Sequence, residues 1–359
     1  MAKGSIFKKL LASVTAAALF CCAAISVSAE TSEYVNNDKL YSHDGDESIY
    51  ISDNNFLYNF KGENPGVTIC GYVGDSTEID IPHLINGREV SAIDKDTFTN
   101  DKRIVSVSFP NSVKSIGENS FNGCPNLKTV NLAFGVSQLN NVFCDCPALE
   151  SMKFPQGVNS IFESFKNCTS LSYIRFARSV TSIGEHSFSG CTALKQIDWL
   201  GSIIKLHNAF DGCTSLESVS IPAGVVLIDG AFDGCTSLKK ITFPDSLLYI
   251  TGGFSDCTSL KELTLPDKLL FVNEAFNNCD SLTKLECNHQ TKISETAFLH
   301  CPKLVIKREK NIIKPLLLWT GLILLMGITG YFTFRLLTYM SNNMLREQKK
   351  KSVEPNQPL

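Results

Sequence analysis

A repeat of 22 or 23 residues runs through most of the chain and limits what it can fold into. The stretch AFDGCTSLESVSIP at residues 209–222 is followed by AFDGCTSLKKITFP at residues 231–244. A unit of this length cannot enclose a hydrophobic core alone, so neighbouring units must stack and share one. The sequence therefore predicts a solenoid in which each unit forms one coil.

Three series of apolar residues keep this spacing through ten units. The first series consists of Phe98, Phe121, Phe143, Phe165, Phe188, Phe210, Phe232, Phe254, Phe276 and Phe298. The second begins with Asp101 and continues with Cys124, Cys146, Cys168, Cys191, Cys213, Cys235, Cys257, Cys279 and Cys301. The third consists of Ile104, Leu127, Leu149, Leu171, Leu194, Leu216, Leu238, Leu260, Leu282 and Leu304. Because the three series stay in step, we expect each to form a column of like side chains.

Each unit also contains the pattern of a short strand. In residues 235–254, Ile241 and Phe243 alternate with polar residues, as in a strand with one buried face. Pro244 then ends the strand, since proline has no amide hydrogen to donate. The predicted fold class is a repeat solenoid of the leucine-rich type with short parallel strands, about ten coils of 22–23 residues, and a small β cap at the N-terminus.

These residues resemble those of the BspA-like leucine-rich repeat surface proteins, whose pattern is LxxVxIPxxVxxIGxxAFxxCxx. Residues 179–197, SVTSIGEHSFSGCTALKQI, follow that pattern closely, and residues 67–98 are similar to the opening of such arrays. The resemblance covers roughly residues 50–306. It implies a leucine-rich solenoid on a cell surface, in a group associated with adhesion and with binding to host or partner molecules.

Both ends of the chain carry signals for export and anchoring. Residues 1–29 combine early lysines, a short apolar run and small residues before Glu30, which predicts a secretory signal peptide rather than a retained membrane helix. Residues 315–334 contain no charge and are long enough to cross a bilayer as a helix. A buried helix of a soluble domain is the alternative, and the basic residues on both sides of the run count against it. We therefore expect a single-pass protein of the cell membrane, with the N-terminal ectodomain outside and the C-terminal tail in the cytoplasm.

Charge is distributed unevenly along this predicted organisation. Residues 30–306 contain 21 Lys and Arg against 33 Asp and Glu, a net charge of −12, which excludes nucleic acid as an expected partner.

We also expect Lys307 and Glu309 to occupy core positions of the last coil and to form a polar cap. The predicted segments are a signal peptide (1–29), an acidic flexible segment (30–47), a β cap (48–82), the leucine-rich repeat solenoid (83–306), a basic juxtamembrane linker (307–314), a transmembrane helix (315–337) and a cytoplasmic tail (338–359).

We find no motif that would make the chain an enzyme. GxSxG, HExxH and phosphate-binding glycine loops are absent from the sequence, so we predict no catalytic, cofactor-binding or metal-binding residues. A zinc site at Cys287, His289, His300 and Cys301 is the alternative, but both of its cysteines fall on core positions.

Nine cysteines share one register, with neighbouring Cβ atoms about one strand spacing apart. This distance is too large for a disulfide bridge, which predicts free thiols packed as small apolar groups.

The outward residues of the strands form the expected binding surface. Tyr173 and Arg175 are of the types enriched at interface hot spots, although a plain solvated face is the competing interpretation. We expect the partner to be an extracellular protein or glycan, with a structural spacer or scaffold subunit of a membrane complex as the alternative function. The predicted partner-binding residues are Tyr173, Arg175, Gln196, Asp198, Lys240, Thr242, Glu262 and Thr264.

Overall fold

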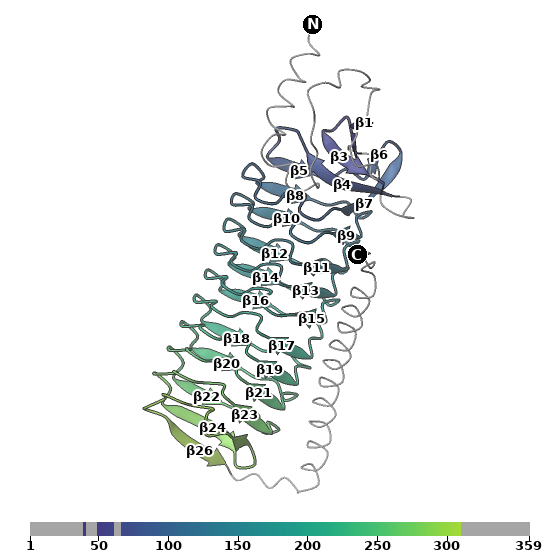
Figure 1. Cartoon of the computed structure of the whole chain (residues 1–359). Coiled ribbons are helices and arrows are strands. Elements are labelled where there is room, and N and C mark those ends of the chain that lie inside the picture. The colour runs from purple at the N-terminus through teal and green to yellow at the C-terminus, as the bar shows by residue number, and fades with distance from the viewer. Residues whose placement is uncertain (1–38, 41–48, 61–65, 310–359) are drawn as a thin grey trace, which may run out of the picture. The chain divides into compact units, whose positions relative to one another are not determined.

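The computed structural model describes residues 39–40, 49–60 and 66–309, in which all regular secondary structure is β-strand (Figure 1). No helix in this part of the chain has the length and hydropathy to cross a membrane. The predicted signal peptide, transmembrane helix and cytoplasmic tail lie outside the described residues. So do most of the predicted acidic segment and residues 310–314 of the predicted linker.

Each coil contributes a strand to a first row of parallel strands, which we call the first ladder. Backbone pairing within it is interrupted, giving the groups β5–β8–β10, β12–β14–β16, β18–β20 and β22–β24–β26. These are the strands predicted from alternation, and they confirm the solenoid. Their bounds are β5 (Glu78–Asp80), β8 (Ser106–Ser108), β10 (Thr129–Asn131), β12 (Ser151–Lys153), β14 (Tyr173–Arg175), β16 (Gln196–Asp198), β18 (Ser218–Ser220), β20 (Lys240–Thr242), β22 (Glu262–Thr264), β24 (Lys284–Asn288) and β26 (Val305–Glu309).

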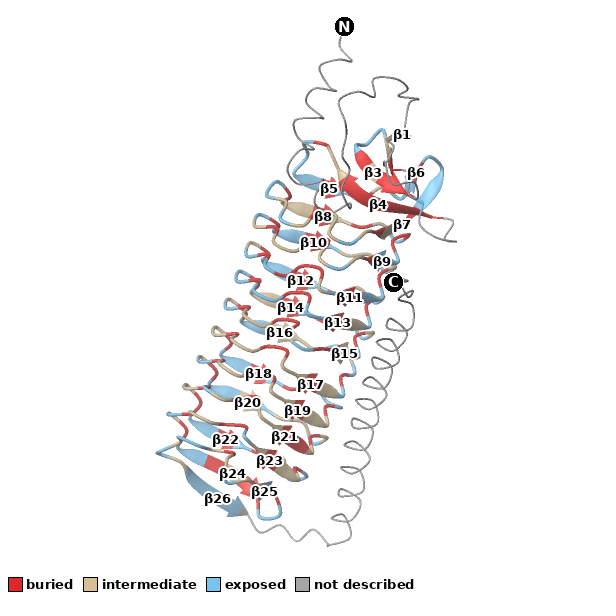
Figure 2. Ribbon diagram, in the orientation of Figure 1, coloured by how far each residue is buried: buried red, intermediate tan, exposed pale blue. Residues whose placement is uncertain are grey.

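A second strand in each coil forms another parallel row, the second ladder, which the sequence pattern did not predict. Eight of its strands, from β11 to β25, pair without interruption. In each of its three-residue strands the middle residue is apolar and buried, and every flanking residue except Tyr249 is at least partly exposed (Figure 2). The bounds are β7 (Arg88–Ile93), β9 (Ser115–Ile116), β11 (Gln138–Asn140), β13 (Ser160–Phe162), β15 (Ser182–Ile183), β17 (Lys205–His207), β19 (Leu227–Asp229), β21 (Tyr249–Thr251), β23 (Phe271–Asn273) and β25 (Lys292–Ile293).

Antiparallel strands cover the amino-terminal end of the core. The chain passes from β1 to β4 by antiparallel pairing, and β4 then pairs in parallel with β7, the start of the second ladder. Buried Phe56, Tyr58 and Ile69 fill the end of the shared core. The remaining bounds are β1 (Lys39–Leu40), β2 (Ile49–Ile51), β3 (Phe56–Asn59), β4 (Val67–Tyr72) and β6 (Leu84–Ile85), which pairs with β7.

The predicted phenylalanine column is continuous from Phe98 to Phe298. Ring centroids of consecutive members lie between 4.8 and 5.5 Å apart, and the rings are stacked in every pair. This separation is slightly larger than the spacing of neighbouring β-strands, about 4.8 Å. One ring per coil therefore matches the rise of the solenoid.

Two residues with left-handed backbone flank each phenylalanine from Phe98 to Phe276, one placed two positions before the ring and one placed two positions after it, whereas Phe298 has only the one after it. Only glycine adopts this conformation freely, and Asn, Asp and His tolerate it better than other residues. Glu163 and Glu274 are the exceptions in the first of these columns, with φ of 45° and 49°. The column before the ring comprises Asp96, Asn119, Asn141, Glu163, His186, Asn208, Gly230, Gly252 and Glu274. The column after it comprises Asn100, Gly123, Asp145, Asn167, Gly190, Gly212, Gly234, Asp256, Asn278 and His300.

The cysteine column links coils through hydrogen bonds as well as packing. Each Sγ, from Cys124 to Cys301, donates to the backbone carbonyl of the phenylalanine in the preceding coil, at 3.1 to 3.5 Å. The twelve cysteines of the described residues carry free thiols. The thiols therefore satisfy carbonyl groups in the turn, a role that the interpretation as small apolar groups did not include.

The last strand is shifted by one residue from the expected register. Ile306 and Arg308 lie opposite the inward residues Leu285 and Cys287, while Lys307 lies opposite the outward Glu286. The prediction that Lys307 and Glu309 occupy the core positions was therefore wrong. Because β26 runs to Glu309, the predicted linker begins within a strand.

We expect Phe232→Ala to lower the free energy of unfolding by roughly 3–5 kcal/mol, because it leaves a cavity in the shared core. Phe232 is fully buried, and its ring stacks on Phe210 and Phe254 with centroids 5.3 and 5.4 Å away. Denaturant unfolding of the full-length chain measures the change. Phe134→Ala is the control, since that side chain is 64% exposed. Equal losses in the two variants would contradict the stacked core.

We expect Glu274→Asn to raise the free energy of unfolding by about 0.5–1 kcal/mol, because asparagine tolerates a left-handed backbone better than glutamate does. Asn119, Asn141 and Asn208 occupy the equivalent position in other coils. Glu150→Asn is the control at an exposed position outside the left-handed columns. A melting temperature that rises equally for both variants would show that charge, rather than backbone strain, is responsible.

Candidate functional site

The predicted binding residues lie on the outward side of the first ladder. Tyr173 and Arg175 belong to β14, and Gln196 and Asp198 belong to β16, which pairs with it. The register places Tyr173 opposite Gln196 and Arg175 opposite Asp198. The structure therefore brings the first four predicted residues into one cluster, which we call the tyrosine cluster.

Asp198 is the centre of the tyrosine cluster. The Tyr173 hydroxyl donates to Asp198 Oδ2 at 2.6 Å, and Gln196 Nε2 donates to Asp198 Oδ1 at 2.9 Å. These two bonds, together with the nearby charge of Arg175, lower the pKa of Asp198. The bond to the carboxylate also raises the pKa of Tyr173, so the phenol stays protonated. The cluster thus presents an oriented aromatic ring beside an ionised carboxylate and an exposed guanidinium.

Packing beneath the tyrosine cluster fixes the strands that carry it. Phe176 and Trp199 follow Arg175 and Asp198 directly and point into the core. Their rings stack with centroids 5.2 Å apart, and Trp199 also contacts Phe210 edge-on. Arg175 and Asp198 are therefore each followed along the chain by an aromatic residue that anchors the strand in the core.

The other four predicted residues form a separate part of the same face. Lys240 and Thr242 are on β20 and Glu262 and Thr264 on β22, and all four are exposed. Strand β18 separates them from β16, and backbone pairing is interrupted on both sides of the β18–β20 pair. The structure therefore does not join these residues to the tyrosine cluster in one continuous sheet.

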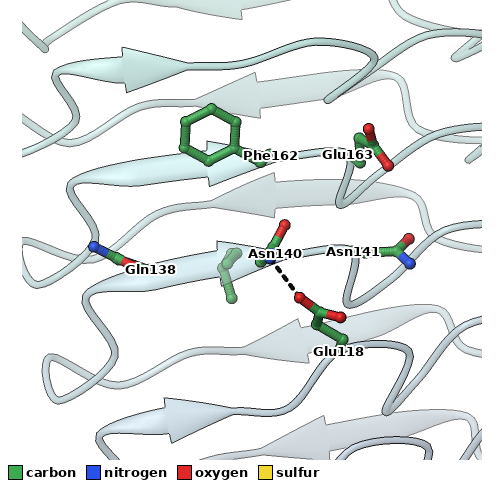
Figure 3. A pocket seen from close by; sticks show the side chains of 7 residues that line it. Glu118, Gln138, Asn140, Asn141, Phe162 and Glu163 are labelled. Carbon is green, nitrogen blue, oxygen red and sulfur yellow. Dashed lines mark hydrogen bonds between the residues drawn. The ribbon is translucent and has the colours of Figure 1, made fainter. Parts of the chain in front are cut away.

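A pocket of about 470 Å³ opens on the outward side of the second ladder, where no site was predicted (Figure 3). Its most unusual feature is Phe162, which ends β13 and is 42% exposed. A comparison of the coils could have indicated it, since an aromatic residue stands where other coils have small or polar ones. The lining residues are Glu118, Gln138, Leu139, Asn140, Asn141, Phe162 and Glu163.

Two aspartates lie in the turns that follow the phenylalanine column. Burial, strengthened by the negative charge of Asp233, raises the pKa of Asp211 to about 7. Burial also raises the pKa of Asp233, whose Oδ1 accepts a hydrogen bond from the Ser255 amide at 2.7 Å. Asp211 Oδ1 is buried and has no hydrogen-bond partner in the described residues. The pair is a source of pH-dependent stability.

The described residues contain no group of three or more His, Cys, Asp and Glu side chains placed to hold a metal ion. Of the residues in the zinc alternative, Cys287 is buried on β24, and Cys301 Sγ donates to the Phe276 carbonyl oxygen at 3.1 Å. Both cysteines thus take part in the core of the solenoid.

Two ladders of short parallel strands, a stacked aromatic core and variable outward side chains define a leucine-rich repeat solenoid. Residues 91–208 and 202–313 match the model of the BspA type leucine rich repeat region, a model that comprises six copies of the repeat. The chain therefore belongs to the BspA-type leucine-rich repeat family, as its sequence pattern indicated. No curated protein is a significant match to the chain.

Solved structures of leucine-rich repeat proteins are similar to this chain. One from Bacteroides ovatus is 26% identical, with a TM-score of 0.54 over 70% of this chain and 80% of its own. Another from T. pallidum is 27% identical, with a TM-score of 0.46 over 58% of this chain and 89% of its own. The first of these supports the repeat fold.

We expect Asp211→Asn to reduce the dependence of stability on pH. The folded-state pKa of about 7 exceeds the unfolded value, so the folded state binds more protons and wild-type stability falls as the pH rises from about 4 to 7. Above pH 7 the variant should be more stable than wild type by about 1–2 kcal/mol, since Asp211 is partly open to solvent and its charge is partly screened. At pH 4 the difference should be small.

Thermal unfolding of the two full-length chains over this pH range measures the difference. Asp245→Asn is the control at an exposed position. If the difference between wild type and Asp211→Asn does not change with pH, the buried carboxylate does not titrate in this range.

Proposed function

We propose that this protein is a cell-surface binding protein whose solenoid recognises an extracellular protein or glycan through the first ladder. The observation that carries the proposal is the tyrosine cluster on β14 and β16. Its ring and guanidinium are of the types that supply most of the energy at interfaces. The hydrogen bonds to Asp198 hold the phenol in one orientation, which lowers the entropy lost when a partner binds.

We further propose that the chain is exported and held at the membrane by one helix within residues 315–337. The sequence supports this part of the proposal through the signal peptide features of residues 1–29 and the 20 uncharged residues that start at Pro315. This topology would place the repeats outside the cell. The relatives reported above are leucine-rich repeat proteins, and we propose that this chain, too, acts by binding rather than by catalysis.

One observation favours a second function, that of a structural spacer or scaffold subunit. The second ladder pairs eight strands without a break, which gives the solenoid a continuous hydrogen-bonded row. A rigid rod of this kind can hold other components at a fixed distance. The tyrosine cluster links only two neighbouring coils, so a role as a spacer does not account for it, and we place this function second.

The binding function predicts that Tyr173→Ala combined with Arg175→Ser lowers the affinity of cells displaying the full-length chain for their partner by about tenfold or more, because both hot-spot groups are lost. Cell adhesion to matrix and to neighbouring cells is measured over a range of expression levels, with saturation as the criterion of specific binding. Thr129→Ala combined with Asn131→Ser changes the same two register positions on β10 and is the matched control.

The scaffold function predicts a different outcome in the same experiment. Cells would then show no saturable adhesion, and the chain would copurify with a membrane protein whether or not the tyrosine cluster is intact. Equal adhesion by wild type and the Tyr173/Arg175 variant would also contradict binding through the first ladder.

A further inference from the structure

We propose that the pocket on the second ladder binds a neutral pyranose sugar, with Phe162 as its stacking platform. This site lies on a different face from the tyrosine cluster and does not depend on it. The pocket draws its lining from three successive coils, so its geometry is set by the stacking of the solenoid (Figure 3). Glu118 comes from the first coil, Gln138 to Asn141 from the second, and Phe162 and Glu163 from the third.

Phe162 is an exception at its register position. It lies opposite Asn140 of the preceding coil, and the following coils have Gly184, His207, Asp229, Thr251 and Asn273 at that position. None of these is an apolar aromatic residue, so the core of the solenoid does not require one here. The side chain is 42% exposed, and Phe162 is among the residues that line the pocket.

The next coil provides room for the ring of Phe162. A Cβ atom at Gly184 would lie 1.9 Å from Cδ1 of Phe162, closer than any real contact allows. The ring therefore lies directly against the backbone of Gly184, and a side chain at residue 184 would displace it. This contact holds the aromatic surface in place at the edge of the pocket.

Polar groups face the pocket beside this ring. Asn140 Nδ2 donates to Glu118 Oε1 at 2.7 Å, which fixes the orientation of both side chains (Figure 3). The Asn140 amide oxygen and the second Glu118 oxygen keep lone pairs that can accept hydrogen bonds from hydroxyl groups. Gln138 adds a further amide from the other end of β11, so both donors and acceptors are available to a ligand.

Glu163 is a second departure from the repeat beside Phe162, and Glu274 has the same left-handed backbone outside the pocket. The backbone of Glu163 is left-handed, at φ 45°, where most coils have Asn, Asp, His or Gly. Strained backbone of this kind is concentrated at binding sites. Phe162 and Glu163 are adjacent and both line the pocket, so two departures from the repeat coincide at one place.

The chemistry of the pocket fits a neutral sugar ring. A pyranose has an apolar C–H face that can pack on an aromatic ring and a rim of hydroxyl groups that can pair with amides and carboxylates. Glu118 and Glu163 would repel anionic sugars and phosphate groups. A cation such as choline is the competing ligand, but the amides of Gln138 and Asn140 would then contribute little to its recognition.

Titration calorimetry of the purified full-length chain, in a detergent without a sugar headgroup, tests the proposal. The neutral probes are maltotriose, triacetylchitotriose and cellotriose, and the charged probes are sialyllactose and choline. We expect saturable binding of at least one neutral probe, with an affinity that does not change when the salt concentration is raised about tenfold. Phe162→Thr should weaken that binding by about tenfold or more, because the stacking surface is lost.

The variants are chosen to keep the fold intact. Phe162→Thr and Glu163→Asn each introduce a residue that another coil has at the same position, and both should weaken sugar binding. Glu274→Asn makes the same backbone change outside the pocket and should leave sugar binding unchanged. The Tyr173/Arg175 double variant should also bind sugar like wild type, which separates this site from the first ladder.

Three results would overturn the proposal. These are the absence of binding by every neutral probe, equal sugar affinity in wild type and Phe162→Thr, and preferential binding of choline or sialyllactose.

Discussion

Stacking of one phenylalanine ring on the next is the interaction on which the rest of the structure depends. The ring of each coil touches the rings above and below, so the separation of the rings and the rise of the backbone must agree. That agreement lets both ladders form hydrogen bonds, and it places each thiol within reach of the preceding coil. A coil that gained or lost several residues would put these contacts out of step with its neighbours, which explains why the repeat length varies by only one residue.

The same constraint divides each coil into residues that are fixed and residues that can vary. The phenylalanine, cysteine and leucine columns face inward, and the left-handed positions beside each ring admit few residue types. Outward positions of the two ladders are not restricted in this way. Candidate binding residues are therefore best sought where an outward residue departs from its column, as Tyr173 does on the first ladder and Phe162 on the second.

Much of this fold could be predicted from the sequence because the core residues recur at regular intervals of 22 or 23 residues. The alternation at Ile241 and Phe243 predicted the strands of the first ladder and their outward residues. The four residues of the tyrosine cluster are among those outward residues. The second ladder was missed because most of its strands have a single buried residue, as Leu139 in β11, and one inward residue gives no alternation. The register shift of β26 was missed because its coil has one residue fewer between Leu304 and the inward position of the strand. The spacing of the three columns does not reveal this loss, since it falls after the last column residue. The pocket needs residues from three coils, which no single repeat reveals.

The two ladders differ in how firmly they hold their outward side chains. Pairing in the first ladder is interrupted on either side of the β18–β20 pair, so the tyrosine cluster and the residues of β20 and β22 stand on separate short sheets. In the second ladder, pairing is continuous through β11, β13 and β15, the strands that carry or support the pocket. A small ligand gains most from groups held rigidly in place, while a large partner can gain from segments that adjust separately. The distribution of backbone pairing thus agrees with a small-ligand pocket on the second ladder and a broader interface on the first.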